Sequence, residues 1–240
     1  MEIGALGIPL IFNNILQGRS LEEAHAVSSF YDPYIGQDAG YLQVARLTGL
    51  GSTLVVIPLE GTPLEAYNPL LSDPTRRGIT FEGFFEWAAH TRALAETEWT
   101  EAKPWNSPTS AVLGPGESRS YGVVFLVADG VRNIEKTLIE NDRPVAVGIP
   151  GYVLPTDLKG RLFLKSPSPV QSLDMEPAEA LTLTPTGTTE GGWAAYDVRG
   201  NRWGRSRVTV SYANGTRQTL HYKVIRSQTQ VVEDMGRYLT

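Results

Sequence analysis

The stretch RVTVSYANGTRQTLHYKV, residues 207–224, decides the fold more clearly than any other part of the sequence. Every second residue on either side of its central Asn-Gly pair is apolar: Val208, Val210, Tyr212, Leu220, Tyr222 and Val224. Period-two alternation around an Asn-Gly turn is typical of a β-hairpin. We therefore predict two antiparallel strands with one face on a core and the other in solvent.

Short strands bounded by turn residues continue upstream of this hairpin. They are the segments GRLFLK (160–165), VQSLDM (170–175), ALTLTP (180–185) and GWAAYDV (192–198). Several short strands at this spacing predict an immunoglobulin-like β-sandwich. Two prolines and two glycines in GIPGYVLPTDL (148–158) indicate a domain boundary before it. We expect the sandwich to occupy residues 151–226.

Residues 1–150 are predicted to form a larger set of strands. The apolar runs TLVVIPL (53–59) and YGVVFLVA (121–128) predict strands that are buried on both faces. Helices are few: a helix at 129–142 closes this first domain, and a linker helix at 227–240 follows the sandwich. The fold class expected for the whole chain is therefore all-β with a few short helices.

Composition excludes several classes of function. The 240 residues include no cysteine, which rules out disulfides, cysteine zinc sites and thiol catalysis. A net charge of −5 without any long basic run argues against a nucleic-acid partner. No run approaches the roughly 18 apolar residues of a membrane span. The turns GLGS (49–52) and GPGE (114–117) lack the features of phosphate-binding loops, so we expect no cofactor.

Aromatic and acidic residues gather in three irregular stretches, FYDPY (30–34), FFEW (84–87) and EWTEAKPW (98–105). Sugar-binding surfaces combine flat aromatic faces with Asp, Asn and Glu, because ring C–H bonds stack while hydroxyl groups need acceptors. The candidate carbohydrate or partner contacts are Tyr31, Tyr34, Asp38, Glu86, Trp87, Trp99 and Trp105. The alternative is that these aromatic residues cap the sandwich core, since large aromatic side chains bury most of their area.

Two carboxylates offer a further candidate site. Glu82 and Glu86 flank the tripeptide GFF and would share one face of a strand. Glycoside hydrolysis needs two carboxyl groups roughly 5–10 Å apart across a sugar-sized cleft. This pair could therefore make the chain a small glycosidase. The other interpretation is that both are ordinary surface carboxylates.

Two long stretches resemble a known family. They are EIGALGIPLIFNN with GYLQVARLTGLGSTLVVIPLEGTPLEAYNP, and LGPGESRSYGVVFLVADGVRNIEKTLIENDRPVAVGIPGYVLPTDLKGRL. The most distinctive element is PGES…YG…F…A…GVRNI followed by PGYVLPTDL. The chain resembles, over essentially its whole length, a domain-of-unknown-function family of secreted fungal and bacterial proteins related to six-hairpin glycosidases.

Proteins of that kind carry a β-supersandwich, an immunoglobulin-like module, a linker helix and an (α/α)₆ toroid with the catalytic acids. The resemblance implies that residues 1–150 are part of the supersandwich, 151–226 the immunoglobulin-like module and 227–240 the linker helix. It implies no catalytic residue in this chain. It also implies an extracellular parent protein, although MEIGALGIPLIFNN lacks the basic leader and cleavage site of a signal peptide.

Three hypotheses of function follow. The first is a non-catalytic β-sandwich region of a secreted glycoside-hydrolase-like protein, which supports a toroid and contacts polysaccharide or oligosaccharide. In that arrangement Tyr31, Tyr34 and Asp38 could face the toroid. The second is a structural or protein-interaction module without a sugar site, which predicts buried tryptophans. The third is the small glycosidase with a carboxylate pair.

Overall fold

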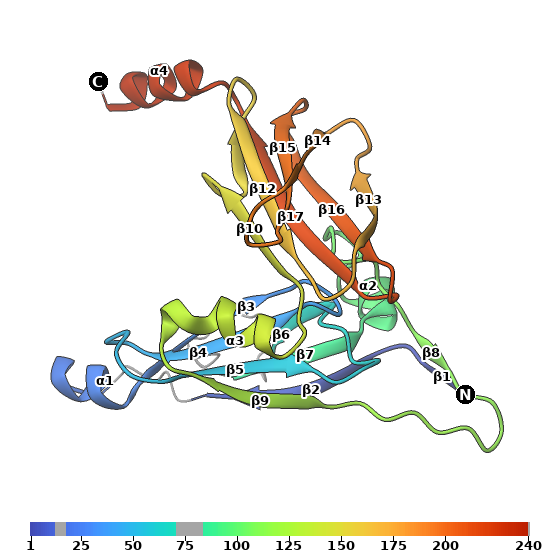
Figure 1. The fold of residues 1–240 in the computed structure, drawn as a ribbon. Helices are drawn as coiled ribbons and strands as arrows, with labels where there is room; N and C mark the ends of the chain where they lie inside the picture. Colours follow the sequence, from blue (N-terminus) through green and yellow to red (C-terminus); the bar gives the residue numbers. More distant parts are fainter. Residues whose placement is uncertain (13–17, 71–83, 240) are drawn as a thin grey trace. The chain divides into compact units, whose positions relative to one another are not determined.

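The computed structural model describes residues 1–12, 18–70 and 84–239 and divides the chain into two compact units, Met1–Thr137 and Leu138–Thr240 (Figure 1). The elements up to the boundary are β1 (Glu2–Ile3), β2 (Leu6–Ile11), α1 (Leu21–Val27), β3 (Ser29–Tyr34), β4 (Tyr41–Arg46), β5 (Thr53–Pro58), β6 (Ala66–Pro69), β7 (Phe84–His90), α2 (Arg92–Thr97), β8 (Ala111–Val112), β9 (Val123–Ala128), a 3-10 turn (Val131–Asn133) and α3 (Ile134–Glu140), which spans the boundary. The elements that follow are β10 (Val145–Ile149), β11 (Val153–Pro155), β12 (Lys159–Lys165), β13 (Val170–Glu176), β14 (Leu181–Thr188), β15 (Ala194–Gly200), β16 (Gly204–Tyr212), β17 (Arg217–Ile225) and α4 (Gln228–Leu239). The predicted all-β class is confirmed.

The second unit is a sandwich of two four-stranded sheets, ordered β10-β12-β15-β14 and β11-β17-β16-β13. Its strand pairs are antiparallel except for β11 and β17, which run parallel. When β10 and β11 are counted as two halves of one first strand, the order β10-β12-β15-β14 is that of the first, second, fifth and fourth strands of an immunoglobulin domain. The six apolar residues that alternate along the predicted hairpin are all buried: Val208, Val210, Tyr212, Leu220, Tyr222 and Val224.

The hairpin turn explains why the sequence has Gly215 after Asn214. The backbone N–H of Gly215 donates to the carbonyl of Tyr212 (2.9 Å), and Gly215 has a φ of 87°. A type I turn followed by one residue at positive φ is a common hairpin connection, and glycine adopts that conformation without steric cost.

The division between the units differs from the predicted boundary. Strand β10 pairs with β12, from Val145 opposite Lys165 to Ile149 opposite Arg161, so it belongs to the sandwich of the second unit. The sequence prediction had instead ended the first domain after residue 150. The prolines and glycines of 148–158 therefore connect β10 in one sheet to β11 in the other, and are not a linker between domains.

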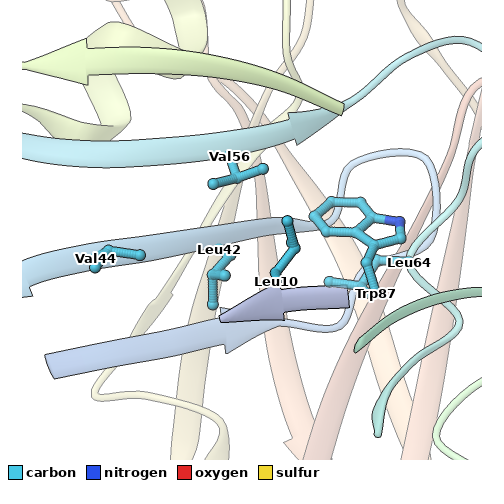
Figure 2. Packing of buried hydrophobic residues seen from close by; sticks show 6 residues of the cluster. All are labelled: Leu10, Leu42, Val44, Val56, Leu64 and Trp87. Carbon is cyan, nitrogen blue, oxygen red and sulfur yellow. The ribbon is translucent and has the colours of Figure 1, made fainter. Parts of the chain in front are cut away.

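The first unit packs the sheet β2-β7-β6 against the sheet β3-β4-β5-β9. Its core, drawn in Figure 2, consists of Leu10, Leu42, Val44, Val56, Leu64 and Trp87. The indole N–H of Trp87 donates to the backbone carbonyls of Thr62 and Pro63, both at 3.2 Å. The largest core side chain therefore also satisfies its one polar group inside the core.

Strand β9 is present as predicted, but the expectation that both its faces are buried is wrong. Phe125 and Val127 are 55% and 69% exposed. The register places Phe125 opposite Val56, so these side chains share the face of the sheet that carries the core. Because β9 is the last strand of its sheet, the core ends along it, and only its start at Val123 packs against the cluster.

The helices of the described residues are short. The predicted helix at 129–142 begins with a 3-10 turn and becomes α-helical only at Ile134–Glu140. The predicted linker helix is α4. None of the helices described combines the length and the apolar character needed to cross a membrane.

Candidate functional site

A cavity of about 260 Å³ opens in the first unit, beside strand β6 and the loop after α2. The lining residues that matter for its chemistry are Glu65, Tyr67, Asn68, Trp99, Lys103 and Trp105. Among the described residues β6 is the edge strand of its sheet, so none of the described strands pairs with its open side. The loop that follows α2 forms the other wall.

Asn106 fixes this loop to the start of β6. Its side-chain amide donates to the backbone carbonyls of Leu64 (3.2 Å), Glu65 (3.0 Å) and Ile35 (3.3 Å). Asn106 is buried, so these bonds are shielded from water. Upstream, the N–H of Trp99 donates to the carbonyl of Leu94 (2.9 Å). The Asn106 bonds therefore hold the loop end next to Trp105 against the residues that lead into β6, while the Trp99 bond stays at the end of α2.

The aromatic side chains offer both flat and edge-on surfaces. Trp105 is 46% exposed and Trp99 is half-buried. The ring of Tyr67 stacks on Phe85 with centroids 4.8 Å apart and planes inclined by 2°, and Tyr31 meets the same Phe85 ring at 5.3 Å. These rings support one another, so the wall that Tyr67 contributes is rigid.

Glu86 sets the orientation of the Asn68 amide. The Nδ2 atom of Asn68 donates to Oε1 of Glu86 at 2.9 Å. A carboxylate only accepts hydrogen bonds, so the NH₂ group faces Glu86 and the carbonyl oxygen faces away from it. Residue 7 must be small for this to occur, because a Cβ on Gly7 would lie 2.0 Å from Oε2 of Glu86.

Glu65 is a buried carboxylate at the pocket, only 3% exposed. Its Oε2 accepts from the hydroxyl of Thr91 (2.8 Å) and the N–H of Thr109 (3.1 Å), and its Oε1 accepts from the hydroxyl of Thr109. Burial raises the pKa of Glu65, and the hydrogen bonds from Thr109 and Thr91 counteract part of that rise. Both carboxyl oxygens are thus occupied by protein donors.

A chain of hydrogen bonds continues from Glu65 to the imidazole of His90. The Thr109 hydroxyl donates to Glu65, so it must accept from Nδ1–H of His90, 2.8 Å away. The Nε2 atom of His90 then carries no proton and accepts from the hydroxyl of Tyr121 at 2.9 Å. Burial lowers the pKa of His90, with a smaller contribution from the charge of Arg119. The neutral imidazole is the form that completes this chain.

The structure brings together only part of the predicted contact set. Trp99 and Trp105 line one pocket, and Glu86 holds the Asn68 side chain that lines it. Tyr31 lies behind the pocket wall, against Phe85.

The prediction that Trp87 contacts a ligand is wrong, because Trp87 is fully buried in the core and its ring is not available to a ligand. The side chains of a strand alternate between faces, so Trp87 points inward where Glu86 points outward. Tyr34 packs against Tyr41 (5.4 Å between centroids), and neither Tyr34 nor Asp38 lines the pocket. Glu82 lies outside the described residues.

The sequence analysis did not single out the pocket residues in and just before β6. Glu65, Tyr67 and Asn68 belong to the segment LEAYNP (64–69), which was considered only within the family resemblance. A carboxylate next to a strand is seldom buried without partners. Nothing in the sequence indicated that Glu65 is buried, because the residues that donate hydrogen bonds to it, Thr91 and Thr109, are 26 and 44 residues away.

A family model described as "Family of unknown function (DUF5695)" matches residues 1–240. The chain belongs to this family. No curated protein matches this DUF5695 chain. Its fold is similar to a solved structure named "Polysaccharide Lyase BACCELL_00875", with a TM-score of 0.66 and 14% sequence identity over 95% of this chain and 30% of that one. The chain thus spans less than a third of the lyase, and at this identity the likeness shows the fold alone.

These findings confirm the coarser part of the expected resemblance. The DUF5695 chain is a domain of unknown function whose β fold also occurs in a protein named as a polysaccharide lyase. The fungal or bacterial origin, secretion and the relation to six-hairpin glycosidases stay predictions. No three His, Asp or Glu side chains within residues 1–12, 18–70 and 84–239 are grouped closely enough to hold a metal ion.

Proposed function

We infer that this chain is a non-catalytic β region of a secreted carbohydrate-active protein, which supports a helical toroid and contacts polysaccharide. The observation that carries the inference is the convergence of Trp99 and Trp105 with Asn68 in one pocket. Aromatic faces stack on the C–H face of a sugar ring, while amide groups bond its hydroxyls. The polysaccharide lyase of similar fold supports a carbohydrate context.

The pocket chemistry favours binding over catalysis. Glycoside hydrolysis uses two carboxyl groups on either side of the scissile bond. Glu65 is the one acidic side chain among the described residues that line the pocket, and both its oxygens accept hydrogen bonds from threonines. Glu86 is engaged with Asn68.

Calorimetric titration of the chain with a panel of soluble polysaccharides and their oligosaccharides tests this function. We expect binding by the wild-type chain and its loss in Trp99→Ala and Trp105→Ala. Trp203→Ala is the matched control, because Trp203 is an exposed tryptophan of the second unit. Release of reducing ends or of unsaturated sugars by the purified chain would contradict the non-catalytic role.

A protein-interaction module is the second candidate, and exposed apolar side chains favour it. Helix α4 exposes Val232, Met235 and Tyr238, and β9 exposes Phe125 and Val127. Contiguous exposed apolar surface commonly marks an interaction site. Sedimentation of the chain with and without the change Met235→Lys tests it: this candidate predicts self-association that the change relieves, and a monomer at every concentration argues against it.

A further inference from the structure

We propose that the pocket beside β6 is a subsite for a single neutral pyranose ring, and that Asn68, oriented by Glu86, is the residue that determines which ring it accepts. This inference rests on the proposed function and deepens it, because it names the size, the charge and the discriminating contact of the ligand. It is carried by the volume of the pocket, the charges that line it and the geometry of the Asn68 amide.

The volume sets the size of the ligand. Sites for drug-sized molecules span roughly 300–1,000 Å³, and this pocket holds about 260 Å³. A volume of this size matches one sugar ring with its hydroxyl groups. Trp105 is the more exposed of the two tryptophans, so it lies at the mouth, where the rest of a polysaccharide would leave the pocket.

The charges set the class of sugar. Glu65 and Lys103 are the acidic and the basic side chain among the described residues that line the pocket, one of each sign. Recognition of a uronate carboxylate in proteins generally relies on Arg or on several cations. The described lining offers a single cation for such a carboxylate, Lys103. The lining is thus suited to a neutral ring.

The Asn68 amide sets the discrimination. One N–H of its NH₂ group donates to Oε1 of Glu86, which fixes the amide and leaves the carbonyl oxygen on the other side as an acceptor of defined direction. A sugar hydroxyl donates to such an acceptor, and a ring without that hydroxyl would displace water from the half-buried Asn68 without replacing its hydrogen bond. Sites built to bond a substrate hydroxyl reject the analogue that lacks it strongly.

Tryptophan fluorescence and calorimetry with neutral monosaccharides, their uronic acids, their monodeoxy analogues and the oligomers of two to four units test the proposal. We expect one neutral monosaccharide to bind within about threefold of its tetramer, because only one ring enters the pocket. The uronic acid should bind more weakly. One monodeoxy analogue should lose about tenfold or more, the scale of one lost hydrogen bond in a desolvated site.

Variants of the amide and its support separate the contact from a general structural effect. Asn68→Leu should weaken monosaccharide binding by about tenfold or more, and the preference against the deoxy analogue should disappear. Glu86→Gln keeps an acceptor for Asn68 and should bind nearly as the wild type does, whereas Glu86→Leu frees the amide to rotate and should lose part of the preference. Amide hydrogen exchange checks that each variant is folded; should Asn68→Leu not fold, the Glu86 pair carries the test.

The outcomes distinguish this proposal from the function on which it rests. Affinity that rises more than about tenfold from one to four units, with binding still lost in Trp99→Ala, would overturn the single-ring subsite and leave carbohydrate binding in place. Tighter binding of the uronic acid would overturn the neutral class alone. An unchanged deoxy preference in Asn68→Leu would remove Asn68 from recognition. Absence of binding to every sugar would overturn both proposals.

Discussion

The two units bury polar groups in different ways. In the second unit the hydroxyl of Tyr212 donates to Oε1 of Gln218 at 2.6 Å, and both residues are fully buried. Burial raises the pKa of Tyr212 far above its ordinary value, so this pair is neutral at any physiological pH. In the first unit the buried polar side chains include two that titrate, Glu65 at the pocket and His90, which is joined to it through Thr109.

This difference bears on the proposed function, in which one unit would bind carbohydrate and the other would support the structure. Neither group of this neutral pair carries a charge out of water, so its burial costs less than that of an ionised group, although Nε2 of Gln218 has no hydrogen-bond partner among the described residues. A buried carboxylate costs more and is retained where its charge or its hydrogen bonds serve a site. The contrast supports the proposal that the first unit carries recognition and the second unit support, and the following changes test that proposal.

The largest expected effect is that of Trp87→Ala in the core of the first unit. Removing a fully buried tryptophan leaves a cavity and the acceptors Thr62 and Pro63 without their donor. We expect the free energy of unfolding of the first unit to fall by about 3–5 kcal/mol. Hydrogen exchange resolved by peptide measures it for each unit separately, and a loss confined to the second unit would contradict the assignment of Trp87 to this core.

The next effect compares the two buried polar groups directly. Glu65→Leu removes the acceptor of Thr91 and Thr109 and should destabilise the first unit by about 1–3 kcal/mol, the cost of buried donors without partners. Tyr212→Phe removes one neutral bond and should cost the second unit about 1 kcal/mol. Urea unfolding followed by hydrogen exchange gives both values. A larger loss for Tyr212→Phe would reverse the comparison.

The titration of His90 gives a smaller effect with a defined sign. The folded pKa lies below the ordinary value of about 6.5, so the unfolded chain binds a proton that the folded chain refuses. The stabilising contribution of the neutral imidazole is therefore complete above pH ~6.5 and is lost as the pH falls from there to the folded pKa.

Glu65 has the opposite pH dependence, because burial raises its pKa. Its contribution to the stability of the folded state is complete below the ordinary pKa of about 4.3 and is lost as the pH rises through the folded pKa. The His90→Gln variant isolates the histidine, since only the difference between it and the wild type reports on His90. We expect this difference to shrink as the pH falls below about 6.5. A difference that is independent of pH would show that His90 is not held neutral.

The smallest effect on stability is that of Trp105→Ala, and it sharpens the separation of binding from folding. Trp105 lies at the surface of the pocket, so we expect a change within about 0.5 kcal/mol in the free energy of unfolding of the first unit. Sugar binding should nevertheless be lost. Thermal unfolding and titration of the same preparation check both, and a strongly destabilised variant would make Trp105 a structural residue.

Part of the site was accessible from the sequence. The stretch EWTEAKPW placed Trp99 and Trp105 close together, and both line the pocket. The prediction that Trp87 contacts a ligand rested on its residue type alone and is wrong. Whether its ring is buried depends on which face of β7 packs against the second sheet. Likewise β9 has the apolar run of a doubly buried strand, but its position at the sheet edge leaves Phe125 exposed.

The sequence alone determined the elements whose information is local. Alternation and the Asn-Gly pair specify the hairpin of β16 and β17, because side chains of a strand alternate between faces and a tight turn limits the pairing register. Only the tertiary structure decided the sheet that β10 joins, the burial of Glu65 and the meeting of β6 with the loop after α2. These depend on contacts between residues far apart in the chain, and local preferences carry no record of such partners.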